Sequence, residues 1–327
     1  MMTKRVLVTG SEGSLMTAVI PKLLEKNYIV YGADNLSRYG RRHPKHVDYK
    51  FLKQDLRYES QVTWLMDHVR PDVVIQGAAR IYGVGGFNAH CADILGDDIA
   101  IQTNLLKAAT QYGVERFVYI SSSMVYETCG SPCSEEEVET AVTPYTDYGL
   151  SKLTGERLAR SFYKQYRMPY TIWRPFNIIT PYENADMELG YSHVFADFLY
   201  NLVVKKLNPL PIIGDGKQVR CFTWIDDVAQ AIVDNLLTPA SRNEIFNIGN
   251  AEPICMRSLA EMIYKKAHAL GLVARSDELD FQTVKEYPND VRIRIPDVSK
   301  IERILGWTPT KKISASIDEC LKEFVTK

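Results

Sequence analysis

The chain has 327 residues, 46% of them hydrophobic, which is enough for one large domain or two smaller ones with a sizeable core. Its formal net charge of −1 gives no reason to expect nucleic acid or a membrane as a partner. The six cysteines lack metal-ligand spacing, so no metal is expected. The sequence shows no signal peptide and no apolar run long enough to span a membrane, and we therefore expect a reducing, cytoplasmic setting.

Short apolar runs alternate with amphipathic stretches from residue 4 to about residue 175. The apolar runs predict strands at Arg5–Thr9, Tyr28–Ala33, Tyr49–Lys53, Val73–Gly77, Arg116–Ile120 and Tyr170–Trp173. The amphipathic stretches predict helices at Ser14–Lys26, Gln61–Arg70, Ile94–Tyr112 and Tyr145–Tyr166. Because strands that alternate with helices form parallel βαβ crossovers, the pattern predicts an α/β protein with a Rossmann-type doubly wound parallel sheet.

The rhythm changes after Pro175, where loops rich in proline and glycine interrupt shorter elements. A helix is predicted to begin at Asp226, and a last one near Ile313–Val325. We therefore expect a Rossmann domain over residues 1–175, to which later segments return. Residues 176–327 are expected to form mainly a smaller mixed α/β lobe that binds substrate.

A glycine turn joins the first predicted strand to the first helix. Gly10 permits a tight turn, and Gly13 lets the backbone approach a pyrophosphate whose charge the helix N-terminus meets. Such glycine pairs also occur in ordinary turns, but Asp34 follows about 20 residues later, where a carboxylate binds adenosine ribose hydroxyls. Asp34 favours NAD over NADP, because it would repel a 2′-phosphate. A cluster that could reverse this preference is more simply an exposed basic loop: Arg38, Arg41 and Arg42.

Tyr148 and Lys152 stand four residues apart in a predicted helix and therefore share one face. A phenol with a pKa of about 10 is a poor base at neutral pH. The lysine ammonium and a positively charged nicotinamide ring would lower the pKa of Tyr148 toward the working range. This spacing also arises by chance on helices, but here it lies downstream of a strand that ends in a serine cluster, Ser121, Ser122 and Ser123.

The two motifs together resemble those of the extended short-chain dehydrogenase/reductase family, the NAD-dependent sugar-nucleotide epimerases and dehydratases. The resemblance selects Ser122, four residues before Tyr126 of a Val-Tyr pair, as the partner of the reacting sugar oxygen, with Ser123 as the alternative. It implies that Tyr148 is the catalytic base and that Lys152 binds the nicotinamide ribose. It implies an NAD site made of Gly10, Gly13, Ser14, Leu15, Asp34, Asn35, Asp55, Leu56, Ala78, Ala79, Asn104, Tyr148 and Lys152.

Asn104 and a residue outside this set, Met16, carry further expectations. Asn104 matches a family asparagine that supports the backbone of the active site. Met16, by contrast, stands where the family pattern has a third small residue. We expect Met16 either to point elsewhere or to push the first helix outward, which could weaken the affinity for NAD.

The resemblance continues into the second half of the chain. It implies that Asn177 and Arg220 contact the diphosphate of a sugar nucleotide, with Arg292 as a second guanidinium, whereas Arg294 could be structural. Residues 83–86 look like a flexible loop beside the sugar. His193 could be a second acid/base, but a backbone contact with substrate or a helix cap is the simpler interpretation. The expected substrate-binding residues are Gly85, Ser122, Ser123, Asn177, His193, Arg220 and Arg292.

The residue after Ser123 limits which of the family's reactions we expect this chain to catalyse. Family dehydratases have an Asp-Glu pair directly after the serine or threonine, where this chain has Ser123-Met124. Family 3,5-epimerases have a thiol two residues after the serine, where this chain has Met124. We therefore expect a 4-epimerase that acts through a transient 4-keto sugar. The alternatives are a 4-keto-sugar reductase or nucleotide-sugar dehydrogenase and, more remotely, a non-catalytic dinucleotide-binding protein. By analogy, the helices at Ile94–Tyr112 and Tyr145–Tyr166 would form a homodimer interface.

Overall fold

A parallel sheet forms the centre of the protein, whose computed structural model describes residues 3–43, 45–185, 188–274 and 278–325. Its seven strands in the described residues follow the order β11-β6-β5-β4-β1-β2-β3. All neighbours run parallel, and the central strands β4 and β5 are buried along their whole length, as a sheet covered on both faces requires. The strands are β1 Arg5–Thr9, β2 Ile29–Asp34, β3 Tyr49–Lys53, β4 Val73–Gln76, β5 Arg116–Ile120, β6 Tyr170–Pro175 and β11 Glu244–Ile248.

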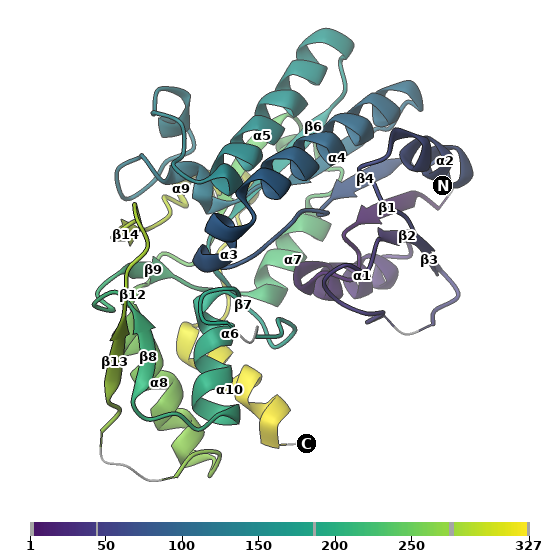
Figure 1. The fold of residues 1–327 in the computed structure, drawn as a ribbon. Helices are drawn as coiled ribbons and strands as arrows, with labels where there is room; N and C mark the ends of the chain where they lie inside the picture. The colour runs from purple at the N-terminus through teal and green to yellow at the C-terminus, as the bar shows by residue number, and fades with distance from the viewer. Residues whose placement is uncertain (1–2, 44, 186–187, 275–277, 326–327) are drawn as a thin grey trace.

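Helices cover both faces of this sheet (Figure 1). On one face α1 (Ser14–Glu25) packs against α7 (Ile225–Asp234), and on the other α4 (Cys91–Gln111) lies between α2 (Glu59–Val69) and α5 (Asp147–Tyr166). In α1 the side chains of Met16, Val19 and Leu23 are buried, which is the spacing of an amphipathic helix. The predicted Rossmann-type doubly wound α/β fold is confirmed.

The predicted boundaries differ from the observed ones mainly at helix starts. The helix predicted from Tyr145 begins at Asp147, because the Thr146 side chain accepts a hydrogen bond from the Gly149 N–H and so caps it. The strands predicted at Arg5–Thr9, Tyr49–Lys53 and Arg116–Ile120 begin and end as predicted.

The prediction of a flexible loop at residues 83–86 is wrong. These residues open a short helix, α3 (Val84–Ala89), in which Gly85 and Gly86 are buried. The Gly83 N–H donates to the Tyr191 carbonyl over 2.8 Å, and the Gly85 N–H donates to the Gly190 carbonyl over 2.9 Å. A Cβ on Gly83 would collide with the carbonyl oxygens of this same segment. The glycines therefore serve close backbone packing rather than flexibility.

The smaller lobe is built from short sheets and helices at one end of the central sheet (Figure 1). The sheets pair β7 (Ile178–Ile179) with β10 (Thr223–Trp224), β8 (Leu210–Ile213) with β13 (Phe281–Val284), and β9 (Val219–Cys221) with both β12 (Pro253–Cys255) and β14 (Ile293–Arg294). The helices are α6 (Val194–Leu199), α8 (Met256–Ala269) and α10 (Ile313–Val325), whereas α9 (Ser299–Leu305) packs against β11 of the central sheet. Strand β11 and helix α7, although they follow residue 175, pack into the central sheet and onto α1.

None of the helices formed by the described residues is both long and apolar enough to cross a lipid bilayer. Nor do the described histidine, cysteine, aspartate and glutamate side chains gather in groups of three or more that could hold a metal ion.

Candidate active site

Two adjoining cavities lie at the carboxyl ends of the parallel strands, where doubly wound sheets bind their ligands. The first cavity is lined by residues that follow β1, β2, β3 and β4. The second cavity is lined by residues that follow β5 and β6 and by the smaller lobe. Ser14, Ile81, Glu183 and His193 line both cavities, so a ligand in one would lie beside a ligand in the other.

The glycine turn after β1 forms part of the wall of the first cavity. Gly10 has a φ of +65°, and a Cβ there would lie 2.8 Å from the backbone of Ala78. Gly13 precedes α1, its N–H donates to the Gly10 carbonyl over 2.9 Å, and no side chain caps this end of α1. The bare backbone and the unoccupied N–H groups of the first helical turn fit the pyrophosphate of a dinucleotide.

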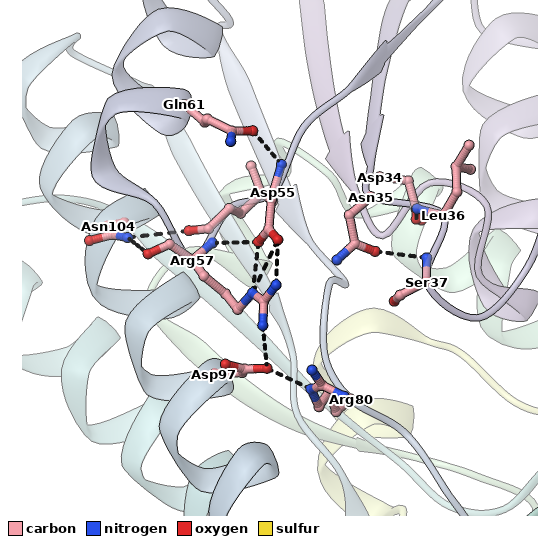
Figure 2. Close-up of polar contacts among 11 residues, drawn as sticks. Asp34, Asn35, Leu36, Ser37, Asp55, Arg57, Gln61, Arg80, Asp97 and Asn104 are labelled. Carbon is pink, nitrogen blue, oxygen red and sulfur yellow. Dashed lines mark hydrogen bonds and ion pairs between the residues drawn. The ribbon is translucent and has the colours of Figure 1, made fainter.

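The acidic residues predicted at the adenosine end lie together at the ends of β2 and β3 (Figure 2). Asp34 accepts hydrogen bonds from the N–H groups of Glu12, over 3.1 Å, and Leu36, over 2.7 Å. The Asn35 side chain hydrogen-bonds Asp55, and all three residues line the first cavity. Burial raises the pKa of Asp34, against the lowering effect of its backbone hydrogen bonds.

An ion-pair network that the sequence analysis did not consider extends this site (Figure 2). Arg57 binds Asp55 through two nitrogens, at 2.9 and 2.6 Å, and contacts Asp97 at 3.3 Å; Arg80 contacts the same Asp97 at 2.5 Å. The Arg57 guanidinium lowers the pKa of Asp55. The network joins the ends of β3 and β4 to helix α4, and Asp55, Arg57, Arg80 and Asp97 all line the first cavity.

The other residues predicted to bind the cofactor either line one of the two cavities or support the backbone that lines them. Ser14, Leu56, Ala78 and Ala79 line the first cavity, whereas Leu15 lines the second. Asn104 lines neither: its amide nitrogen donates to the carbonyls of Leu56, over 3.2 Å, and Arg57, over 3.0 Å. Asn104 therefore supports the backbone after β3, where Leu56 and Arg57 line the first cavity.

Met16 points into the core and lines neither cavity. It is 2% exposed, and its Cε lies over Gly77, where an added Cβ would be only 2.5 Å away. The small residue that lets helix and strand approach is thus on the sheet side, at the end of β4. Because Gly77 has no side chain, α1 packs against the sheet with a methionine at this position.

The arginines after Asp34 lie on a loop in which Arg38 and Arg41 are exposed, as expected, but the loop also makes specific contacts. Arg38 donates to the Ile81 carbonyl and lies 3.8 Å from Glu183, and Arg42 donates to the Tyr182 carbonyl. The buried carboxylate of Glu12 anchors the start of this bridge, because it accepts from the Arg42 N–H and, over 3.3 Å, from the His43 N–H. We call residues 35–43 the arginine strap; it connects the glycine turn to the segment at residues 182–183.

Two of the three predicted catalytic residues, Ser122 and Tyr148, line the second cavity, whereas Lys152 lies next to Tyr148 and lines neither cavity. Tyr148, 5% exposed, is hydrogen-bonded to Ser122 and stacks on Phe87 with 4.4 Å between ring centroids. Lys152 Nζ lies 5.6 Å from the centroid of the Tyr148 ring and donates to the Ile120 carbonyl over 3.3 Å. Burial raises the pKa of Tyr148, while Ser122 and Arg294 act to lower it.

The serine cluster divides its roles between fold and cavity. Ser121 donates to Glu156 over 2.5 Å, and Glu156 forms a buried ion pair with Arg174 at 2.6 Å, which ties the end of β5 to α5 and β6. Ser122 accepts from the Met124 N–H over 3.1 Å and faces Tyr148. Ser123 is buried and lines the second cavity as well.

The residues predicted to bind substrate also lie in the second cavity, with two exceptions. Asn177, His193 and Arg220 line it. Gly85 does not, and Arg292 is exposed and paired with Asp215 at 2.9 Å. The guanidinium in the cavity is that of Arg294, which the sequence analysis set aside; its Nη1 lies 2.8 Å from Met124 Sδ, and its buried Nε has no hydrogen-bond partner among the described residues.

His193 precedes α6, but its side chain caps no N–H of that helix. Its Nδ1 instead lies 2.8 Å from Glu183 Oε1, and Glu183 also accepts from the His193 N–H over 3.0 Å. Burial lowers the pKa of His193, but the Glu183 carboxylate more than offsets this and raises it above its usual value. A Glu–His pair therefore stands where the two cavities meet.

Comparison with known proteins places this geometry in a family. The chain matches the NAD dependent epimerase/dehydratase family over residues 6–249. It is 28% identical to a UDP-glucuronate 4-epimerase from Thermodesulfobacterium geofontis, over 98% of this chain and 94% of that one, and 27% identical to GDP-L-fucose synthase 1 from Arabidopsis thaliana, over 93% and 88%.

A crystal structure of UDP-glucose 4-epimerase with UDP-glucose from Thermotoga maritima has a TM-score of 0.84 and 26% identity, and the match covers 98% of this chain and 99% of that one. The glycine turn, the acidic ends of β2 and β3 and the family match agree on NAD as the cofactor. The chain belongs to the NAD dependent epimerase/dehydratase family, within the extended short-chain dehydrogenases/reductases.

Proposed function

We propose that the protein is an NAD-dependent nucleotide-diphosphate-sugar 4-epimerase. The observation that carries this proposal is the pair of Tyr148 and Ser122 with Met124 beside them in the second cavity. A base and a serine suffice for reversible oxidation of one sugar hydroxyl. Elimination of water, or epimerisation at carbons 3 and 5, needs a further proton-transfer group next to the serine, and a thioether carries no such proton.

The residues support the following reaction. Tyr148 Oη takes the proton of the sugar 4-hydroxyl, and Ser122 holds that oxygen by a hydrogen bond. Bound NAD supplies the acceptor for the hydride from carbon 4 and the donor that returns it. The 4-keto sugar then rotates in the cavity and presents its opposite face for the return of the hydride. Tyr148 gives the proton back to the 4-oxygen, so that neither protons nor electrons are gained or lost overall. Lys152 keeps a positive charge near the phenol, which favours the phenolate.

The arginine strap supports a cofactor that stays bound through many turnovers. Arg38 and Arg42 bridge from beside the glycine turn to residues that follow β4 and β6. Several of these contacts would have to open before a dinucleotide in the first cavity could leave. An epimerase regenerates its cofactor in each cycle and gains from retention, whereas a dehydrogenase or reductase must exchange it.

The second cavity has the charge for a nucleotide diphosphate. Burial and, to a smaller extent, the nearby Arg294 lower the pKa of Arg220 to about 9. Two buried guanidinium groups that repel each other gain from an anion placed between them, and each can bond two phosphate oxygens. Asp290 forms an ion pair with Arg220 at 3.1 Å. The Nε of Arg294 has no hydrogen-bond partner among the described residues and is therefore available to bind the substrate.

The decisive experiment uses purified protein without added cofactor. Incubated with a panel of uridine, guanosine, thymidine and cytidine diphosphate sugars, it should convert at least one to its 4-epimer, as followed by NMR. NAD should co-purify through gel filtration and remain undiminished. A product that appears only with stoichiometric consumption or formation of NADH would favour the reductase or dehydrogenase. Full turnover by Tyr148→Phe would contradict every version of this mechanism.

We further propose that the protein is a homodimer. Helices α4 and α5 lie side by side on one face of the central sheet (Figure 1), where two copies would form a four-helix interface. Light scattering coupled to gel filtration should give twice the chain mass of 37.2 kDa. A monomer across the micromolar range would overturn this.

A further inference from the structure

A buried carboxylate that the proposed reaction does not use lies next to the catalytic lysine. Asp98, on α4, is 5% exposed, and its Oδ2 lies 4.0 Å from Lys152 Nζ. The same carboxylate accepts from the Ser151 hydroxyl over 3.1 Å and from the Arg80 N–H over 3.1 Å. Two contacts from α5 and one from the segment after β4 therefore hold the Asp98 carboxylate in place.

The surroundings of Asp98 contain few other charges. The titratable groups that act on Asp98, Lys152 or Tyr148 are Asp97 on α4, Tyr119 on β5, Glu156 on α5 and Arg294 on β14. Asp97 is occupied by Arg57 and Arg80, and Glu156 by Arg174. Asp98 and Lys152 are therefore each other's nearest opposite charge.

We propose that Asp98 is a positioning residue of the active site, which keeps the buried Lys152 charged beneath Tyr148 and so sets the pH range in which the base works. Only the activity assay below depends on the proposed epimerase function; the direct measurement of Lys152 does not.

The physical argument starts from the cost of burying an ammonium group. Burial lowers the pKa of Lys152, and Asp98 acts in the opposite direction. Burial raises the pKa of Tyr148, and the Asp98 carboxylate raises it further. A negative charge raises the pKa of every group near it, so removal of that charge must lower both values. The two limbs of a pH–activity curve report the loss of a proton by Tyr148 and the loss of charge by Lys152, so a decrease in both pKa values moves both limbs to lower pH.

The test is Asp98→Asn, which keeps the size of the side chain and an acceptor for the Arg80 N–H but removes the charge. Both limbs of the kcat/KM profile should move to lower pH by about one unit or more, the scale expected for a charge within about 4–6 Å. Asp93→Asn, an exposed change of the same kind on the same helix, should leave both limbs in place. If Asp98→Asn lowers kcat but leaves both limbs where they were, Asp98 is only structural and the proposal is overturned.

A second measurement needs no substrate and follows Lys152 directly. In wild-type protein labelled with ¹³C at the lysine Cε, the NMR signal assigned by its absence in Lys152→Met should show a charged Lys152 at neutral pH. In Asp98→Asn, the same signal should titrate at lower pH. A neutral Lys152 at pH 7 in the wild type would overturn the proposal even if the epimerase assay succeeded.

Discussion

The contact between Met16 and Gly77 allows a quantitative test of how this chain tolerates a methionine at the start of α1. A Cβ on Gly77 would lie 2.5 Å from Met16 Cε and 3.1 Å from the Thr9 carbonyl oxygen. In Gly77→Ala the methionine has to leave its rotamer or α1 has to move away from the sheet. Because α1 carries the N–H groups that face the first cavity, the change should reduce both stability and affinity for NAD.

The magnitudes follow from the two kinds of packing error. Gly77→Ala adds one methyl group to a filled site, which typically costs about 1–3 kcal/mol of unfolding free energy. Met16→Ala leaves a cavity and should cost about 2–5 kcal/mol. The double variant should be less destabilised than the sum of the two, by about 1–2 kcal/mol, because the new methyl group enters the space that the methionine left. Part of the cost remains, since the Thr9 carbonyl is backbone and cannot yield.

Urea unfolding of the four proteins, with and without NAD, measures this double-mutant cycle. NAD affinity in Gly77→Ala should fall with stability, and Met16→Ala should restore part of it. Strict additivity of the two free energies would refute the reasoning, because it would mean that the two side-chain positions do not compete for space.

Three further outcomes are expected. Burial raises the pKa of Asp197 from 3.8 to about 7, so the charged form opposes folding; the protein should lose stability as pH rises through this range, and Asp197→Asn should remove that loss in urea unfolding at each pH. Arg294→Met should raise KM for a nucleotide sugar about 10- to 100-fold, as expected for a lost charged hydrogen bond, and Arg292→Met should change KM little. If steady-state kinetics showed a larger increase in KM for Arg292→Met than for Arg294→Met, the exposed arginine would be the one that binds substrate. Glu156→Gln strands Arg174 as an unpaired buried charge and should cost about 3–5 kcal/mol in urea unfolding, with an effect under 1 kcal/mol counting against the ion pair.

Features that depend on local pattern could be predicted from the sequence. Parallel strands in a covered sheet are apolar on both faces, and so Arg116–Ile120 was recognisable as a short apolar run. The α1 start and the glycine turn were also recognisable, because a left-handed Gly10 and an uncapped helix end are properties of a few neighbouring residues. Residues 83–86 were misread because glycines there serve contacts with residues 190–192, and nothing in the local sequence reveals such a distant partner.

Arg292 and Arg294 show where periodicity fails. Residues two apart share a face only within a strand, and β14 consists of Ile293 and Arg294 alone. Arg292 precedes the strand and turns outward to Asp215, so two arginines that look equivalent in sequence lie on different sides of the chain. A very short strand leaves too few residues for alternation to decide such a question.

Asp98 differs from these cases, because the sequence did contain a signal for it. Helix α4 buries Ile94, Asp98, Ile101 and Leu105, which follow one another at helical spacing, so a carboxylate interrupts an apolar face. A charge at such a position is costly unless a partner of opposite sign lies within reach. The sequence could therefore pose the question of a buried partner, but the answer required the packing of α4 against α5, which places Lys152 there. The helix pair that carries Tyr148, the base of the mechanism that we propose, thus also carries the group that we propose sets its working pH.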